Sequence, residues 1–259
     1  MGKNSKIEWT NHTWNPWIGC QKISDGCRNC YAFRDMERYG NDHHPHRTSD
    51  KTFDAPLHWK SPAKVFVCSW SDFFIEDADP WRDWAWEIIQ QIPHLTYQIL
   101  TKRPERIKEC LPKDWGEGWP NVWLGVTAEN QDTANERIPI LLQTPATVRF
   151  VSAEPLLSGI DFNKVIMPDG DHLGPSLFNH GCGAGIDWII CGGESGTNAR
   201  PMHPDWTRNL RDQCQQAGVP FFMKQMGGYP NKRDKLEDMP EDLRIREFPK
   251  NEWEEFLHG

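Results

Sequence analysis

Short apolar runs recur along the chain, and a group of polar or glycine residues follows each of them. The runs lack the alternation of a half-exposed strand, as expected for parallel strands that are covered on both faces. The pattern predicts strands at Trp14–Gly19, Val65–Ser69, Thr96–Leu100, Val122–Val126, Thr147–Val151, Trp188–Cys191 and Pro220–Met223.

Segments with helical periodicity lie between most of these runs. The clearest predicted helices are Pro80–Ile92, Asp132–Gln143 and Pro204–Ala217. Asp79 is the expected N-cap of the first helix, a capping Asp or Thr begins the second, and Gly218 ends the third. The apolar face of the first helix is expected to contain Trp81, Trp84, Ile88 and Ile92.

A strand–helix unit repeated about six to seven times indicates an α/β fold built on a parallel (β/α) barrel, complete or partial and TIM-like. We expect this barrel to occupy residues 1–228, with an irregular loop at Gly40–Ser61 and a Gly-rich insertion at 157–186. Residues 229–259 are highly charged and are predicted to form a C-terminal extension, either a helix or a lid.

Composition narrows the classes of protein. Hydrophobic side chains make up 37% of the 259 residues, and no apolar run approaches the length of a membrane span. The N-terminus lacks a secretory signal, and eight cysteines then favour a reducing, cytoplasmic location over a disulfide framework. The net charge of −8 argues against a protein that coats duplex DNA. The fourteen tryptophans are candidates for flat surfaces on which bases stack.

Three cysteines, Cys20, Cys27 and Cys30, fall within eleven residues of the segment Asn15–Tyr31. The residues between them are polar or small, which predicts a loop that can bring three thiols to one metal centre. Three thiols suit a four-iron cluster with one iron left open, whereas structural zinc normally takes four protein ligands. A zinc site completed by a distant His or Cys, and three ordinary thiols, are the alternatives.

Other thiols and imidazoles leave the same choice between metal binding and a structural role. Cys68 and Cys191 end predicted strands, and Cys182 lies in the insertion. Cys68 and Cys191 are ligands of a second metal, reactive thiols or small packed side chains, and Cys182 is a further candidate ligand. The segment 43–46 contains three histidines, which either bind a metal or belong to a solvated loop.

Polar side chains follow the predicted strands. The C-terminal ends of parallel strands meet at one edge, where active sites form, so we expect these side chains to line a common site. They lie at Ser69–Asp72, Thr101–Arg103, Thr127–Asn130, Ser152–Pro155, Gly192–Ser195 and Lys224–Gln225. Cys20 comes just after the first predicted strand, so the cysteine loop belongs to the same edge.

Four motifs in order, NPWIGC…GCRNCYA, SAEPLL, IICGGESG…ARPMHPDW and GVPFFMKQMGG, closely resemble a phage and bacterial three-cysteine family grouped with the radical S-adenosylmethionine (SAM) enzymes. The resemblance extends from Ile7 to Gly228. It implies a partial or full barrel, a [4Fe-4S] cluster held by Cys20, Cys27 and Cys30, and SAM bound to the open iron. The gap between the first two cysteines is longer than radical SAM enzymes usually have.

The resemblance also implies roles for the residues at the C-terminal edge of the sheet. The catalytic candidates are Lys102, Glu154, Glu194 and Lys224. The cofactor-binding candidates are Tyr31, Ser69, Asp72, Thr101, Thr127, Glu129, Asn130, Ser152, Gly192 and Gly193. For each single residue, a salt bridge or a cap at a strand end is the alternative role.

The implied function is reductive cleavage of SAM to a 5′-deoxyadenosyl radical that acts on a nucleic-acid base, a nucleotide or a related small molecule. The expected partners are this substrate, an electron donor of flavodoxin or ferredoxin type, and a basic protein that would bring nucleic acid to an acidic chain. No membrane is expected, and for a phage-encoded chain the location is the host cytoplasm. Two other functions stay open: a zinc- or cluster-stabilised nucleic-acid-binding barrel without catalysis, and a metal-dependent nuclease.

Overall fold

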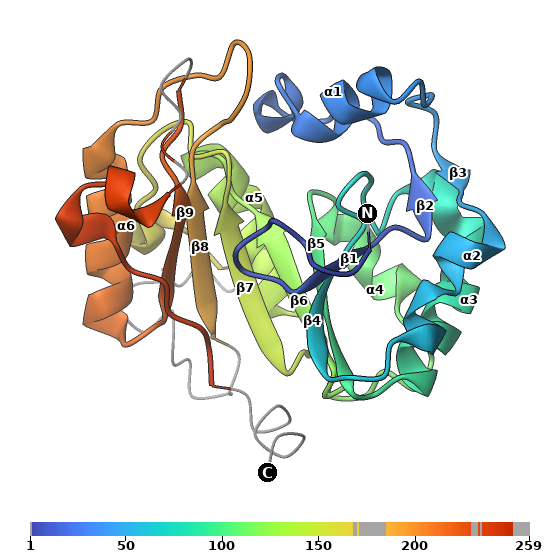
Figure 1. Ribbon diagram of the computed structural model, residues 1–259. Helices are drawn as coiled ribbons and strands as arrows, with labels where there is room; N and C mark the ends of the chain where they lie inside the picture. Colours follow the sequence, from blue (N-terminus) through green and yellow to red (C-terminus); the bar gives the residue numbers. More distant parts are fainter. Residues whose placement is uncertain (1, 168–169, 171–184, 229–232, 234, 251–259) are drawn as a thin grey trace.

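A curled sheet of parallel strands forms the centre of the computed structural model, which describes residues 2–167, 170, 185–228, 233 and 235–250. Within these residues the sheet has seven strands, each hydrogen-bonded to the next along the chain. In spatial order they are β1 (His12–Trp14), β4 (Ala63–Val67), β5 (Leu95–Thr101), β6 (Val122–Thr127), β7 (Val148–Ala153), β8 (Trp188–Gly192) and β9 (Phe221–Gln225). The sheet curls into a half-barrel (Figure 1), so the predicted α/β fold with parallel strands is confirmed in its partial form.

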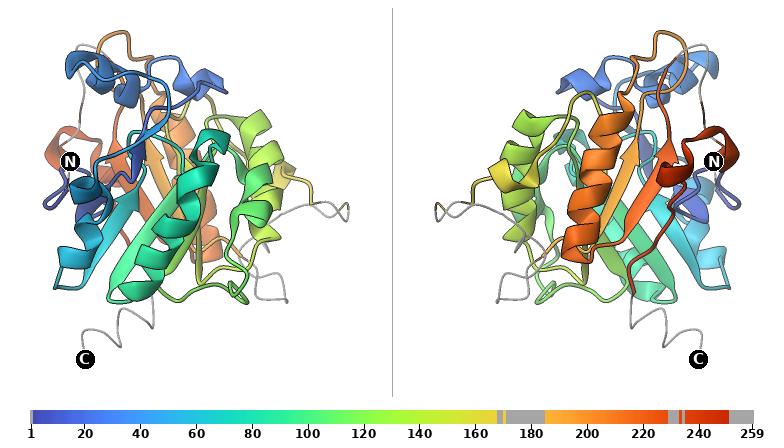
Figure 2. Two further views of the ribbon diagram at one scale, coloured as in Figure 1. Left: turned by 90° about the vertical axis from the view of Figure 1, so that its right-hand side faces the viewer. Right: turned by 90° about the vertical axis from the view of Figure 1, so that its left-hand side faces the viewer.

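Helices cover the convex face of the sheet (Figure 2). The connecting helices are α3 (Asp79–Gln91), α4 (Ile107–Cys110), α5 (Gln131–Leu142) and α6 (Pro204–Ala217). The long β1–β4 connection instead carries α1 (Tyr31–Arg38), α2 (Asp50–Phe53) and a small antiparallel sheet of β2 (Trp17–Ile18) and β3 (His46–Arg47). Short 3-10 helices lie at Asp25–Cys27, Ala55–His58, Glu76–Ala78, Pro104–Arg106, Phe162–Lys164, Leu236–Asp238 and Glu241–Leu243. The β1–β4 connection places α1 over the C-terminal edge of the sheet (Figure 1).

The alternation of side chains along the strands produces two separate cores. Side chains on the convex face, such as Val65 and Ile99, belong to a large core that includes residues of the outer helices. Side chains on the concave face form an aromatic core of Trp9, Phe66, Trp123, Val148, Phe150, Trp188, Ile190 and Phe222. This aromatic core fills the half-barrel away from the C-terminal edge, so the open space of the concave face lies near that edge.

Both edge strands of the half-barrel are covered, which limits pairing with other chains. The N-terminal arm, residues 2–9, folds back on β1 through an antiparallel bridge between Lys3 and His12. On the other edge, Met223 N–H donates to the Ile245 carbonyl oxygen at 2.8 Å. The described part of the predicted C-terminal extension is therefore a strap with two 3-10 helices, and residues 229–232, 234 and 251–259 lie outside the described residues.

The first predicted strand is wrong in its boundaries. Trp14–Gly19 was expected to be one strand, but β1 ends at Trp14 and β2 begins only at Trp17. Pro16 lies between them, and proline has no N–H to donate to a strand ladder. The chain therefore leaves the main sheet at this point and starts the connection that carries the cysteines.

Helix boundaries agree with the prediction to within one residue, but the caps and one face differ. Ala78 is the N-cap of α3, and Asn130 caps α5 through a capping box with Thr133. Trp84 is 52% exposed, although the predicted apolar face included it. The buried face of α3 instead contains Trp86, whose indole N–H donates to the Cys110 carbonyl oxygen at 2.8 Å.

Gly125 gives a test of the concave packing. A Cβ at this position would lie 2.5 Å from two atoms of the Phe150 ring, its cross-strand partner. We expect Gly125→Ala to lower the free energy of unfolding by about 1–3 kcal/mol, because the added methyl overpacks a closed core. Urea denaturation would measure this change. The control is Gly159→Ala, whose Cβ would meet Trp206 only at 3.4 Å; an equal loss in both variants would contradict the packing.

Candidate functional site

The three cysteines of the predicted cluster loop line one cavity at the C-terminal edge of the sheet. Cys20, Cys27 and Cys30 all contribute to a cavity of about 150 Å³, here called the inner cavity. Its other walls come from the ends of β4, β5, β6, β7 and β9 and from the N-terminal arm. The cysteine loop and the strand ends therefore line one cavity.

A buried carboxylate holds the centre of the cysteine loop. Glu129, which follows β6, is fully buried and accepts a hydrogen bond from the Ser24 hydroxyl at 2.7 Å. Its charge is balanced by Arg137 Nη1 at 3.3 Å and Lys102 Nζ at 3.6 Å. Gly26 lies so close that a Cβ there would be 2.5 Å from Glu129 Cγ. Glu129, predicted to bind cofactor, is thus occupied in fixing the loop.

A second carboxylate holds the C-terminal half of the loop. Glu194, which follows β8, forms a salt bridge with Arg200 at 2.6 Å and accepts a hydrogen bond from Asn29 Nδ2 at 2.9 Å. Arg200 also donates to the Asp25 carbonyl oxygen at 2.8 Å. Glu194, predicted as catalytic, therefore joins residues from both sides of Cys27 to the sheet.

The start of the loop is fixed by the ends of β4 and β5. Asp72 accepts from the Thr101 hydroxyl at 2.7 Å and the Lys102 N–H at 2.9 Å, and Arg103 Nη1 lies 3.4 Å from it. Arg103 in turn donates to the Gln21 carbonyl oxygen at 3.1 Å. Asp72 and Thr101, both predicted to bind cofactor, so help to position the residue next to Cys20.

The three thiols have different electrostatic surroundings. Burial, followed by the negative charge of Asp72, raises the pKa of Cys20 to about 12. Burial also opposes ionisation of Cys27, but the Lys102 ammonium and the N–H groups of Ile23 and Ser24 outweigh it and lower the pKa of Cys27. A metal ligand must be a thiolate, so the loop favours the ligand form at Cys27 and would need bound metal to stabilise it at Cys20.

The fit of a metal centre depends on its size. Among the residues that the structure describes, no group of three or more His, Cys, Asp or Glu side chains could hold a metal ion, and this includes the histidines of segment 43–46. The three thiols line one cavity without converging on a single ion. In an iron–sulfur cluster each thiolate binds a different iron, so its ligands stand further apart than those of zinc. Three thiols around one cavity are the donor set that a cluster with one open iron requires.

The other cysteines considered as metal ligands lie in different surroundings. Cys191 is fully buried in the convex core, with its Sγ 3.9 Å from the Thr207 hydroxyl. Cys68 is 3% exposed, has a positive φ of 59° and lines the inner cavity beside Cys20. Cys182 lies outside the described residues.

A larger space, here called the outer cavity, shares part of its wall with the inner one and has a volume of about 1000 Å³. Both cavities are lined by Cys30, Tyr31, Lys102, Glu154 and Lys224. This volume lies at the upper end of the range for small-molecule sites, roughly 300–1,000 Å³. The outer cavity can therefore accept a ligand larger than the inner cavity holds.

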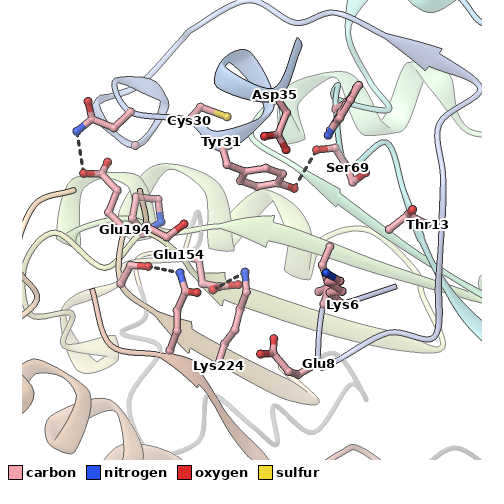
Figure 3. Close-up of a pocket in the computed structure, with 18 of the residues that line it drawn as sticks. Lys6, Glu8, Thr13, Cys30, Tyr31, Asp35, Ser69, Glu154, Glu194 and Lys224 are labelled. Atoms are coloured by element: carbon pink, nitrogen blue, oxygen red, sulfur yellow. Dashed lines mark hydrogen bonds and ion pairs between the residues drawn. The ribbon is translucent and has the colours of Figure 1, made fainter. Parts of the chain in front are cut away.

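An ion pair projects into this shared space. Lys224 Nζ lies 3.0 Å from Glu154 Oε1 (Figure 3). The Ser152 hydroxyl donates to Glu154 Oε2 at 3.3 Å. A Cβ at Gly192 would lie 2.2 Å from Glu154 Oε1, so the glycine leaves room for the carboxylate. Of the four predicted catalytic residues, Glu154 and Lys224 are the pair that faces the cavities without contacting the cysteine loop.

Most of the other predicted site residues line one or both cavities. Tyr31 lines both cavities, and its hydroxyl donates to the Ser69 carbonyl oxygen at 2.9 Å. Thr127 and Ser152 line the inner cavity, and Gly193 lines the outer one. Asn130 caps α5 instead.

Sequence reasoning missed several residues of the site. Lys6 and Glu8 of the N-terminal arm, together with Tyr39 and Asn41 after α1, line the outer cavity. None of them follows a predicted strand. The prediction considered only polar residues that come directly after strands, so it did not include them. The indole of Trp9 is buried in the concave core. The apolar Ile7 and Trp9 were the sequence signal that the arm packs inside the half-barrel.

The fold and the site define an α/β half-barrel protein that carries a three-thiol loop over the C-terminal edge of its parallel sheet. The chain belongs to the family described as "Protein of unknown function (DUF5131)", which matches residues 4–256. No curated protein matches the chain, and no solved structure matches it either. Among the described residues, no helix is both long and apolar enough to cross a membrane.

The Glu194 anchor gives a pH dependence. Burial opposes ionisation of its carboxyl, but the hydrogen bonds from Arg200 and Asn29 outweigh it and hold the pKa below the ordinary value. Such a group stabilises the fold above its unfolded pKa of about 4.3, and the stabilisation is lost as the pH falls through the lower folded pKa. We expect the hydrogen-exchange protection of residues 25–30 to fall as the pH is lowered below the ordinary range of a glutamate pKa. Glu194→Gln should remove this step, and equal protection across the range in the unchanged protein would contradict the anchor.

Proposed function

We propose that this protein is a radical SAM enzyme whose [4Fe-4S] cluster is held by Cys20, Cys27 and Cys30. The observation that carries the proposal is the common inner cavity lined by all three thiols at the C-terminal edge of a parallel half-barrel. The motif resemblance from Ile7 to Gly228 supports it. The cluster and SAM, when bound, supply reductive cleavage of SAM and a radical able to take hydrogen from a substrate.

The chain's own part is to hold the thiols in place before any cofactor arrives. Glu129, Glu194 and Arg103 fasten the loop at the ends of three different strands. Preorganised ligands need little rearrangement on binding, which lowers the entropic cost of assembling the site. Lys102, beside Cys27, favours the thiolate that a cluster requires.

The ion pair of Glu154 and Lys224 is the part of the site that would orient a zwitterionic ligand. Its side chains are 12% and 19% exposed and face both cavities. An ammonium group can pair with Glu154, and a carboxylate can pair with Lys224, each through a charge-assisted hydrogen bond. The aromatic core below excludes water from one side of this space. The proposal also requires an electron donor, for which we propose a flavodoxin or ferredoxin type.

The test is anaerobic reconstitution followed by incubation with SAM and dithionite. The proposal expects a brown protein that converts SAM to 5′-deoxyadenosine and methionine. One tightly bound zinc and no SAM turnover would contradict it and favour a zinc-stabilised nucleic-acid-binding barrel. Mg²⁺-dependent strand cutting that survives loss of the three thiols would also contradict it and favour a nuclease.

A further inference from the structure

An exposed aromatic ring stands on a fixed aromatic base in the wall of the outer cavity. Tyr39, at the end of α1, is 67% exposed and is stacked on Trp70, with ring centroids 5.9 Å apart and an interplanar angle of 23°. Trp70 is only 8% exposed because it packs against Met36 and neighbouring residues of α1. Tyr39 therefore offers one flat, accessible face whose orientation is supported from behind.

The wall around this ring is polar but carries little net charge. Asn41 lies beside Tyr39 in the cavity wall. Its amide can both donate to and accept from a ligand, as in contacts with base edges. The charged side chains that line the cavity are three cations and four anions: Lys6, Lys102, Lys224, Glu8, Asp35, Glu154 and Glu194. A site for a phosphate chain needs an excess of cations, so this balance disfavours phosphate inside the cavity.

We infer that the outer cavity takes a nucleobase, stacked on Tyr39 and hydrogen-bonded by Asn41. An exposed aromatic face stacks on any base, and an amide reads its edge, while the near-neutral wall suits the uncharged ring system. The same chemistry is offered by a free nucleoside or by an extruded base of a single strand. As a statement about the substrate, this inference rests on the proposed radical SAM function of the same site. As a statement about binding, it can be tested separately.

The experiment is equilibrium dialysis of purified protein against thymidine, which shares no base with SAM, with ribose as the matched ligand without a base. We expect saturable thymidine binding and no saturable ribose binding. Tyr39→Phe should bind within about twofold of the unchanged protein, whereas Tyr39→Ala should bind roughly 5- to 100-fold more weakly through loss of one stack. Trp84→Ala, which removes an exposed tryptophan outside the cavity, is the control and should bind normally.

Each outcome has a defined meaning. Undetectable thymidine binding, equal binding of ribose, or full binding by Tyr39→Ala would overturn the inference. Binding of a short oligothymidylate more tightly than thymidine would support it and identify a single strand as the source of the base. Cys20→Ala/Cys27→Ala should still bind thymidine, because neither thiol lines the outer cavity. Failure of SAM cleavage with intact thymidine binding would therefore contradict the proposed function and leave this site standing.

Discussion

Alanine in place of Cys20, Cys27 or Cys30, one at a time, is expected to lower bound iron from about four atoms per chain to below one. Each thiol lines the inner cavity, and in the proposed site two remaining thiolates would leave two irons of the cube without a protein ligand. Cleavage of SAM should fall below detection in the same variants. Iron and acid-labile sulfide analysis after anaerobic purification would measure the first effect.

The matched control is Cys110→Ser at the end of α4. Cys110 is a half-buried thiol that packs against the convex core. It does not line either cavity, so its iron content should equal that of the unchanged protein. If Cys27→Ala and Cys110→Ser retained the same iron, the three-thiol site would be excluded.

Glu129→Ala is expected to cause the largest loss of stability, about 3–5 kcal/mol in the free energy of unfolding. The substitution leaves Arg137, whose side chain is 4% exposed, without its carboxylate partner. It also removes the acceptor of Ser24 and so releases the centre of the cysteine loop. Urea denaturation with an unchanged m-value would measure the loss.

The control for this change is a surface ion pair. Lys235 and Glu237 are 3.9 Å apart, with side chains 70% and 74% exposed, so Glu237→Ala should change stability by less than about 0.5 kcal/mol. A loss for Glu129→Ala no greater than that for Glu237→Ala would show that the buried carboxylate does not anchor the loop.

Most of the fold was predictable because its strands are buried on both faces. The runs at Val122–Val126 and Trp188–Cys191 each match an observed strand to within one residue. The exception is the first run, where Pro16 separates β1 from β2 although the apolar pattern continues through it. Apolar content reports burial, whereas pairing depends on backbone N–H groups that the pattern does not reveal.

The spacing of the three cysteines predicted that their thiols share one place, but it did not predict the roles of the carboxylates. Asp72, Glu129 and Glu194 follow strands, as catalytic residues of barrels do, yet each is satisfied by hydrogen bonds that position the loop or its supports. Arg200 and Asn29, the two partners of Glu194, are distant from each other in sequence, so no local pattern connects them. Only the folded structure shows which charged side chains stabilise the loop and which, like Glu154 and Lys224, face the cavities.

The most direct test of the central claim is electron paramagnetic resonance of the anaerobically reconstituted, dithionite-reduced protein with and without SAM. Three thiols on a cube with an open iron predict the signal of a reduced [4Fe-4S] cluster and a change in that signal when SAM is added. A protein that binds one zinc with no iron or sulfide, or a cluster signal that SAM leaves unchanged, would contradict the account.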